Sequence, residues 1–297
     1  MKLAALDLGS NSFHLLVAEV DESGELRKVH SQKDVLRLGS VVQERGQLSE
    51  EALTAAFTSV RNLAVTARAL NAERLLAVGT AALREARNGE AFCELCRDEL
   101  GLDIELLLGG DEARLAYLGA RSAIGSTAGK VLVADVGGGS IELAVGEQNG
   151  CDAATSLPLG FLRLAHAFPL GEPGGYQRLS RYVQIECEKA RWQLGRFDTL
   201  LLSGGTARAI GKLLGGGVAT ASASQILGLC DQVSETRPEQ LQACGVEPAR
   251  SFTLPAGAAV ISGILAGFSQ RELRISPRGL REGVLLREHS RRVNRAA

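Results

Sequence analysis

One pattern occurs twice in the chain, at residues 3–17 and 131–145. The two segments, LAALDLGSNSFHLLV and VLVADVGGGSIELAV, align without a gap and place Asp7 over Asp135 and Ser12 over Ser140. Each copy contains two apolar runs joined by a turn of small residues, which favours a β-hairpin over a helix. The duplication therefore predicts two related domains, each beginning with a strand, a tight turn and a second strand.

The turns of both hairpins are suited to binding anions. Their glycines and serines present backbone N–H groups and hydroxyls, which form anion-binding concavities. One glycine-rich turn is weak evidence, and structural turns in a duplicated sheet are the alternative, but two aligned turns are a stronger indication. We therefore expect two phosphate loops facing a cleft between the domains. The predicted phosphate-binding residues are Ser10, Asn11, Ser12, Gly137, Gly138, Gly139 and Ser140.

A third anion site is predicted in the segment TLLLSGGTARAIGKL, where an apolar strand meets a helix. Glycines at such a junction allow a ligand to approach the helix N-terminus closely. Gly204, Gly205 and Thr206 are therefore further candidates for phosphate binding. Arg84, in a helix expected to follow Thr80, could reach a phosphate with its guanidinium group.

Acidic residues lie next to the two glycine- and serine-rich turns in the sequence. Asp7 and Asp135 end the first strand of each hairpin, where a carboxylate can hold a divalent metal. Glu142 follows on the return strand, so it is expected to face the loop and to complete a Mg²⁺ shell or orient water. Glu112 lies at a strand-to-helix junction with Asp111. It is either a general base or an ordinary acid of a helix N-terminus, and the pattern alone does not decide between them.

The chain of 297 residues is long enough for two domains. A glycine- and serine-rich bridge at 125–129 separates the copies, so we expect domains at 1–122 and 123–297. Along the chain, a polar loop is expected after Gly39, one helix from Ala81 to Gly101, and a strand and turn over 157–164.

The composition argues against a membrane protein, a secreted protein and a protein that stacks nucleic-acid bases. The chain contains no apolar run of about 20 residues and begins without a secretory leader, so we expect a cytoplasmic protein with no membrane partner. Aromatic residues make up 4% of the chain, which argues against a stacking surface for nucleic acid. Arginines are frequent between Arg271 and Arg295; this segment is either a polyanion-binding surface or a solvated helix face.

Together these motifs resemble the exopolyphosphatase and guanosine pentaphosphate phosphohydrolase (Ppx/GppA) family in its short, two-domain form. The matching segments follow the family order and span nearly the whole chain: DLGSNSFHLLVAEV, VGTAALREARN, LLLGGDEARLAYLGA, VADVGGGSIEL, SLPLGFLRL, LSGGTARAIG, LPAGAAVISGIL and LRISPRGLREGVL. The resemblance implies an α/β fold of two ribonuclease-H-like domains around an interdomain cleft, as in actin, hexokinase and the heat-shock ATPases. It also implies Mg²⁺-dependent hydrolysis of a terminal phosphate.

The resemblance assigns roles to individual residues. The family's catalytic glutamate falls on Glu112, its metal and water ligands on Asp135 and Glu142, and its arginine after the Thr-x-x-x segment on Arg84. The chain departs from the family pattern at Asp111, where a glutamate is usual, and at Leu108, where a serine is common. The first change keeps the charge, and the second alters hydrogen bonding in the loop.

The predicted activity is an exopolyphosphatase that removes the terminal phosphate of inorganic polyphosphate with water activated by Glu112. The nearest alternative is a guanosine pentaphosphate (pppGpp) 5′-phosphohydrolase, which uses the same chemistry. A sugar or acetate kinase of the same fold, and a non-catalytic sensor of polyphosphate or an alarmone, are alternatives of other classes. The family resemblance also leaves a homodimer open.

Overall fold

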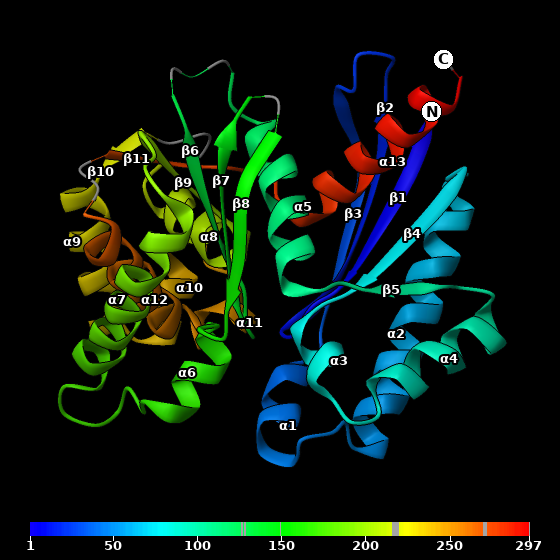
Figure 1. Cartoon of the computed structure of the whole chain (residues 1–297). Coiled ribbons are helices and arrows are strands. Elements are labelled where there is room, and N and C mark those ends of the chain that lie inside the picture. The colour runs from blue at the N-terminus through cyan, green and yellow to red at the C-terminus, as the bar shows by residue number, and fades with distance from the viewer. Residues whose placement is uncertain (126, 128, 149, 216–219, 270–271, 297) are drawn as a thin grey trace.

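The structure is a computed structural model that describes residues 1–125, 127, 129–148, 150–215, 220–269 and 272–296. Two lobes lie side by side in Figure 1, each built around one mixed β-sheet. The first segment of the chain forms β1 (Lys2–Leu8), β2 (Ser12–Val20), β3 (Leu26–Val35), α1 (Leu38–Arg45), α2 (Glu50–Ala69), β4 (Arg74–Gly79), α3 (Ala81–Glu85), α4 (Gly89–Leu100), β5 (Ile104–Leu106) and α5 (Gly109–Arg121).

The second segment begins with the repeated hairpin and is richer in helix. Its elements are β6 (Val131–Val136), β7 (Ile141–Glu147), β8 (Gly150–Leu157), α6 (Phe161–Ala167), α7 (Gly175–Leu194), β9 (Thr199–Ser203), α8 (Gly204–Leu213), β10 (Thr220–Ser222), α9 (Ala223–Glu235), α10 (Pro238–Ala243), α11 (Pro248–Ser251), α12 (Leu254–Phe268), β11 (Glu272–Ile275) and α13 (Leu280–Ala296).

The two sheets share one topology. Their strand orders are β3-β2-β1-β4-β5 and β10-β11-β9-β6-β7-β8. In each, the first strand pairs antiparallel with the second and parallel with the strand that follows the first long helix, β4 in one sheet and β9 in the other. Both predicted hairpins are present, with Asp7 opposite His14 and Asp135 opposite Glu142. The duplication in the sequence is therefore a duplication of structure.

Apolar strands form the cores. The side chains of β1 alternate between two buried clusters, one under α2 and the other under α13, so this strand is apolar on both faces. The second core surrounds β6 and β9 and includes the small-residue helix α12, most of which is buried. Ser49 caps α2 as its sequence predicts, accepting a hydrogen bond from the Ala52 N–H at 3.2 Å.

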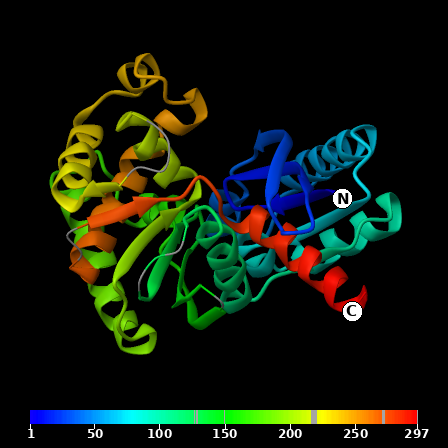
Figure 2. The same cartoon turned by 90° about the horizontal axis from the view of Figure 1, so that it is seen from above.

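Two helices connect the lobes. Helix α5 packs Ala113, Tyr117 and Ala120 against the second sheet, whereas the C-terminal helix α13 returns to the first sheet and packs Val284 and Leu285 there. Figures 1 and 2 show α13 lying along the first lobe, apart from the strand β11 that precedes it. The chain therefore passes between the lobes twice, and the last helix of the predicted segment 123–297 packs on the first sheet.

The crossing of α5 and α13 depends on glycine. A Cβ atom on Gly119 would lie 1.8 Å from the Gly279 carbonyl oxygen, and one on Gly283 would lie 1.8 Å from the Leu115 carbonyl oxygen. Both distances are far below van der Waals contact, so the two backbones touch where side chains are absent. This contact fixes the start of α13 beside the cleft.

Three local expectations were wrong. The helix expected from Ala81 to Gly101 is broken between α3 and α4, because the extended backbone of Ala86 ends α3 and Gly89 packs against the Leu83 carbonyl. Residues 38–45 form α1 instead of a polar loop. The segment 157–164 ends β8 and begins α6, since the apolar residues Phe161 and Leu164 form one helical face buried in the core.

The arginine-rich C-terminal segment forms ion pairs within the molecule. Arg278 pairs with Glu25, Arg287 with Glu105, and Arg292 with Glu73 and Glu288. The pairs with Glu105 and Glu73 join α13 to the first lobe, so for these arginines the structure supports a helix face over a polyanion-binding surface, whereas Arg281 lies in the cavity described below. Arg271 lies outside the described residues. Among the helices described, none combines the length and the apolar character that crossing a membrane requires.

Candidate active site

The predicted phosphate loops meet at the cleft between the lobes. The turn between β1 and β2 and the turn between β6 and β7 border a cavity of about 110 Å³. The loops also touch, because a Cβ on Gly139 would lie 2.5 Å from the Ser10 hydroxyl oxygen. The structure thus brings together most of the predicted residues, and the cavity is lined by Asp7, Ser10, Asn11, Ser12, Glu112, Asp135, Gly137, Gly138, Gly139, Ser140, Glu142, Gly204 and Gly205.

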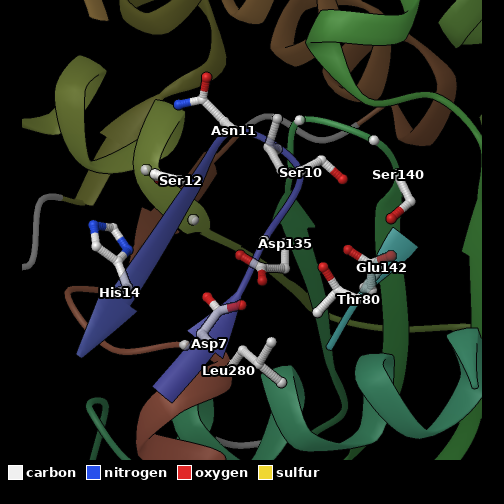
Figure 3. A pocket seen from close by; sticks show the side chains of 18 of the residues that line it. Asp7, Ser10, Asn11, Ser12, His14, Thr80, Asp135, Ser140, Glu142 and Leu280 are labelled. Carbon is white, nitrogen blue, oxygen red and sulfur yellow. The ribbon is translucent and has the colours of Figure 1, made fainter. Parts of the chain in front are cut away.

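Two aspartates stand at the centre of this cavity. Figure 3 shows the carboxylates of Asp7 and Asp135 pointing toward one another, with Thr80, Ser140 and Glu142 to one side. The equivalent ends of β1 and β6 hold them in place. Asp135 accepts a hydrogen bond from the Ser203 hydroxyl at 2.8 Å. Burial, together with the charge of Asp135, raises the pKa of Asp7 to about 7, although Arg281 acts in the opposite direction.

Two glutamates form a second acidic pair. Glu112 comes from the first turn of α5 and Glu142 from β7, and only 6% and 3% of their surfaces are exposed. Burial is the main cause that raises the pKa of Glu142 to about 7, and burial together with the Glu142 charge raises the pKa of Glu112 well above its ordinary value. The Ser156 hydroxyl donates to Glu142 at 2.9 Å.

Arg84 contacts Glu112 instead of lining the cavity. Its Nη1 donates to the Glu112 carboxylate at 2.9 Å and to the Leu107 carbonyl at 2.7 Å. These two bonds fix the guanidinium group against the Glu112 carboxylate. The geometry supports a positioning role for Arg84, and direct phosphate binding by this residue stays a prediction.

Thr206, another predicted residue, and Asn88, a neighbour of Arg84 in the sequence, also lie elsewhere. Thr206 is buried under the glycine turn and accepts a hydrogen bond from Arg250 at 3.4 Å, so it supports the wall of the cavity without lining it. Asn88, four positions after Arg84, exchanges hydrogen bonds of 2.9 Å with the backbone of Leu48. Its amide therefore anchors the segment before α2 and takes no part in the site.

Three arginines complete the cavity: Arg208, Arg250 and Arg281. They come from α8, α11 and the start of α13. No pattern in the sequence relates these three distant segments, and an arginine at the end of a loop is often only a surface residue. The predicted anion-binding turn Gly204-Gly205-Thr206 could have indicated that Arg208, two positions after Thr206, lies near the ligand. Arginine clusters bind phosphate strongly, through charge and forked hydrogen bonds.

The residues present fit a magnesium ion. The Oδ1 atom of Asp7 is buried without a hydrogen-bond partner, which a cation would provide. Within the described residues, no group of three or more His, Cys, Asp or Glu side chains is arranged to hold a metal by itself, so Asp7, Asp135 and Glu142 do not form a complete cage. Mg²⁺ commonly binds one or two carboxylates and takes its other ligands from water and phosphate. Asp7 and Asp135 suit that arrangement.

The raised pKa values predict how the stability of metal-free protein depends on pH. Between about pH 4 and pH 7, buried Asp7 and Glu142 hold protons that the unfolded chain has already released. Unfolding then releases protons, so these groups lower the free energy of unfolding as pH rises through this range. Urea unfolding in the presence of a chelator should show that Asp7→Asn loses less stability than the native chain between pH 5 and pH 8. An equal or greater loss in the variant would contradict the assignment.

The strand order of the two sheets places the chain in the class of proteins with two ribonuclease-H-like α/β domains around an interdomain cleft. Solved structures confirm this predicted fold class. The chain belongs to the Ppx/GppA phosphatase family, whose model matches residues 16–292. It is 30% identical to Exopolyphosphatase 1 of Mycobacterium tuberculosis, over 97% of this chain and 88% of the relative.

Solved structures agree with this assignment. A family member from Aquifex aeolicus matches with a TM-score of 0.83 and 28% identity, over 98% of both chains. An exopolyphosphatase from Cytophaga hutchinsonii has the same fold, with a TM-score of 0.87 and 24% identity, over 98% of both chains. The predicted family is therefore confirmed, because the family model and the relatives match nearly the full length of the chain.

Proposed function

We propose that the protein is an exopolyphosphatase, which hydrolyses the terminal phosphate of inorganic polyphosphate. The observation that carries the proposal is the cavity in which two duplicated glycine loops and three arginines surround buried carboxylates. Glycine loops and guanidinium groups are suited to an anionic ligand, and a metal cation would balance the carboxylates of the same cavity. Similarity to relatives named exopolyphosphatase, along nearly the whole chain, supports polyphosphate as that anion.

The terminal phosphate would lie between the two loops. Backbone N–H groups of Gly137, Gly138 and Gly139, with the hydroxyls of Ser10 and Ser140, would surround its oxygens. Mg²⁺ bound at Asp7 and Asp135 would supply neutralisation of charge on the phosphates. Phosphoryl transfer depends chiefly on such positioning and electrostatic stabilisation, so a preformed cradle accounts for most of the catalysis.

Glu112 would take a proton from the attacking water. The helix N-terminus and Arg84 hold its carboxylate in one orientation, and burial makes it a stronger base than an exposed glutamate. The negative charge of Glu142 adds to that basicity. Glu142 of β7 accepts a hydrogen bond from Ser156 and would orient the same water.

Phosphate release from long-chain polyphosphate and from pppGpp, measured side by side with and without Mg²⁺, tests the proposal. We expect polyphosphate to be consumed faster and a chelator to stop the reaction. Cleavage of pppGpp alone would keep the chemistry and overturn the substrate, whereas release from neither would favour a polyphosphate or alarmone sensor. Phosphate transfer to a small acceptor would favour a kinase. A homodimer and a cytoplasmic location stay predictions of the sequence analysis.

A further inference from the structure

A second cavity adjoins the active site and is larger. It has a volume of about 350 Å³ and lies between β3 of the first lobe and the segments around α8 and α11 of the second. The two cavities share the wall formed by His14, Gly205, Arg208, Arg250 and Arg281. A ligand that leaves the first cavity past these arginines would therefore enter the second.

The lining of the second cavity is strongly basic. Lys33 and Lys212 join the three shared arginines, and Glu247 is the one carboxylate among the described residues that line it. None of the three arginines forms an ion pair with any described residue. Burial and the charge of Arg281 lower the pKa of Arg208, and burial and the charge of Arg208 lower that of Arg250. Such a cluster of like charges is stabilised by a bound anion.

We propose that this second cavity binds the phosphates that follow the terminal one in the polyphosphate chain, and that Lys212 and Lys33 set the preference for long chains. The inference rests on the proposed function, because it extends the same substrate from the active site. A polyphosphate carries a negative charge on every phosphate, which matches a cavity with basic groups on both the β3 side and the α8 side. Their contacts would increase affinity for long chains without contributing to the reaction at the terminal phosphate.

A phosphate chain fits this cavity better than a nucleoside. No phenylalanine, tyrosine or tryptophan is found among the described residues that line it, whereas proteins commonly stack bases on such rings. Its hydrophobic lining comes from small or aliphatic side chains, such as Ala209 and Val246.

Glu247 reduces the positive charge of this cavity. Its carboxylate pairs with Lys33, and the contact joins β3 of one lobe to the start of α11 in the other. Phosphate must compete with this carboxylate for Lys33. Removing the negative charge should therefore strengthen polyphosphate binding, whereas removing a lysine should weaken it, and a general folding defect would not produce these opposite effects.

The test measures binding of fluorescently labelled polyphosphate to variants made in a Glu112→Gln background. We expect Lys212→Ala to raise Kd for long-chain polyphosphate about ten-fold, as loss of one charged contact predicts, and to change Kd for inorganic phosphate, measured by competition, much less, because a single phosphate occupies the terminal site alone. Glu247→Gln should lower Kd for the long chain. Lys189→Ala removes an exposed lysine of α7 that lines neither cavity and serves as the matched control.

Equal effects of Lys212→Ala and Lys189→Ala on long-chain binding would overturn the inference. So would equal loss of affinity for inorganic phosphate and for the long chain, because the contact would then belong to the terminal site. Weaker binding of pppGpp with unchanged binding of polyphosphate would make the cavity a nucleoside site and would also overturn it. Failure of the native protein to release phosphate would contradict the proposed function alone, since the binding differences would still decide the role of the cavity.

Discussion

Replacing Glu112 with glutamine is expected to lower kcat for polyphosphate hydrolysis by about 10²–10⁴-fold, the range typical of a lost general base. Glutamine has the size of glutamate and keeps an oxygen for the hydrogen bond from Arg84, so the fold should persist. Binding of polyphosphate should be unchanged or tighter, since a negative charge leaves the cavity. Steady-state phosphate release and the binding assay above measure the two effects separately.

The neighbouring acid provides the control. Asp111 shares the first turn of α5, but its side chain is 57% exposed, forms a 3.6 Å ion pair with Arg114 and does not line the cavity. Asp111→Asn should therefore keep kcat within about two-fold, because surface ion pairs contribute little. If the Glu112 variant retained activity near that of Asp111→Asn, Glu112 could not be the base, and Glu142 would become the first residue to test in its place.

Replacing Gly283 with alanine should have the largest effect on stability. The added methyl group would lie 1.8 Å from the Leu115 carbonyl oxygen and 3.2 Å from the Gly119 nitrogen, and these backbone atoms cannot move like the end of a flexible side chain. The helices α5 and α13 must separate, so we expect a loss of about 3 kcal/mol or more in the free energy of unfolding. Urea unfolding monitored by circular dichroism measures this loss.

Gly228 offers a matched substitution. It lies in helix α9, and nothing lies within 4 Å of the position its Cβ would take. Gly228→Ala should leave stability unchanged or raise it by about 0.4–1 kcal/mol, because alanine restricts the unfolded chain. Similar stability in the two variants would show that the close contact between the helices is absent in solution.

The repeated hairpins made much of the site predictable. Asp7 and Asp135, at equivalent strand ends, meet because both strands are apolar on both faces and must be buried at the centre of a sheet. The two glycine turns follow at the same edge of their sheets, so their meeting in a cleft was also predictable. The family resemblance then supplied a role for Glu112 that the pattern alone left open.

Other features depend on tertiary packing that no local pattern records. Arg250 reaches the cavity from a short helix in a segment without a motif, and Arg281 reaches it because α13 returns to the first lobe. The apolar periodicity of α13 predicts a buried face but does not specify which sheet buries it. The contact of Arg84 with Glu112 joins two segments that no local pattern relates, and the end of α3 at Glu85 accompanies the packing of Gly89 against Leu83.

The double passage of the chain between the lobes limits how they can move. Two connections restrain the second lobe more than one would, and helices α5 and α13 also touch backbone to backbone at Gly119 and Gly283. The C-terminal helix therefore ties the second half of the chain to the first sheet, and the same helix carries Arg281 into the cavity.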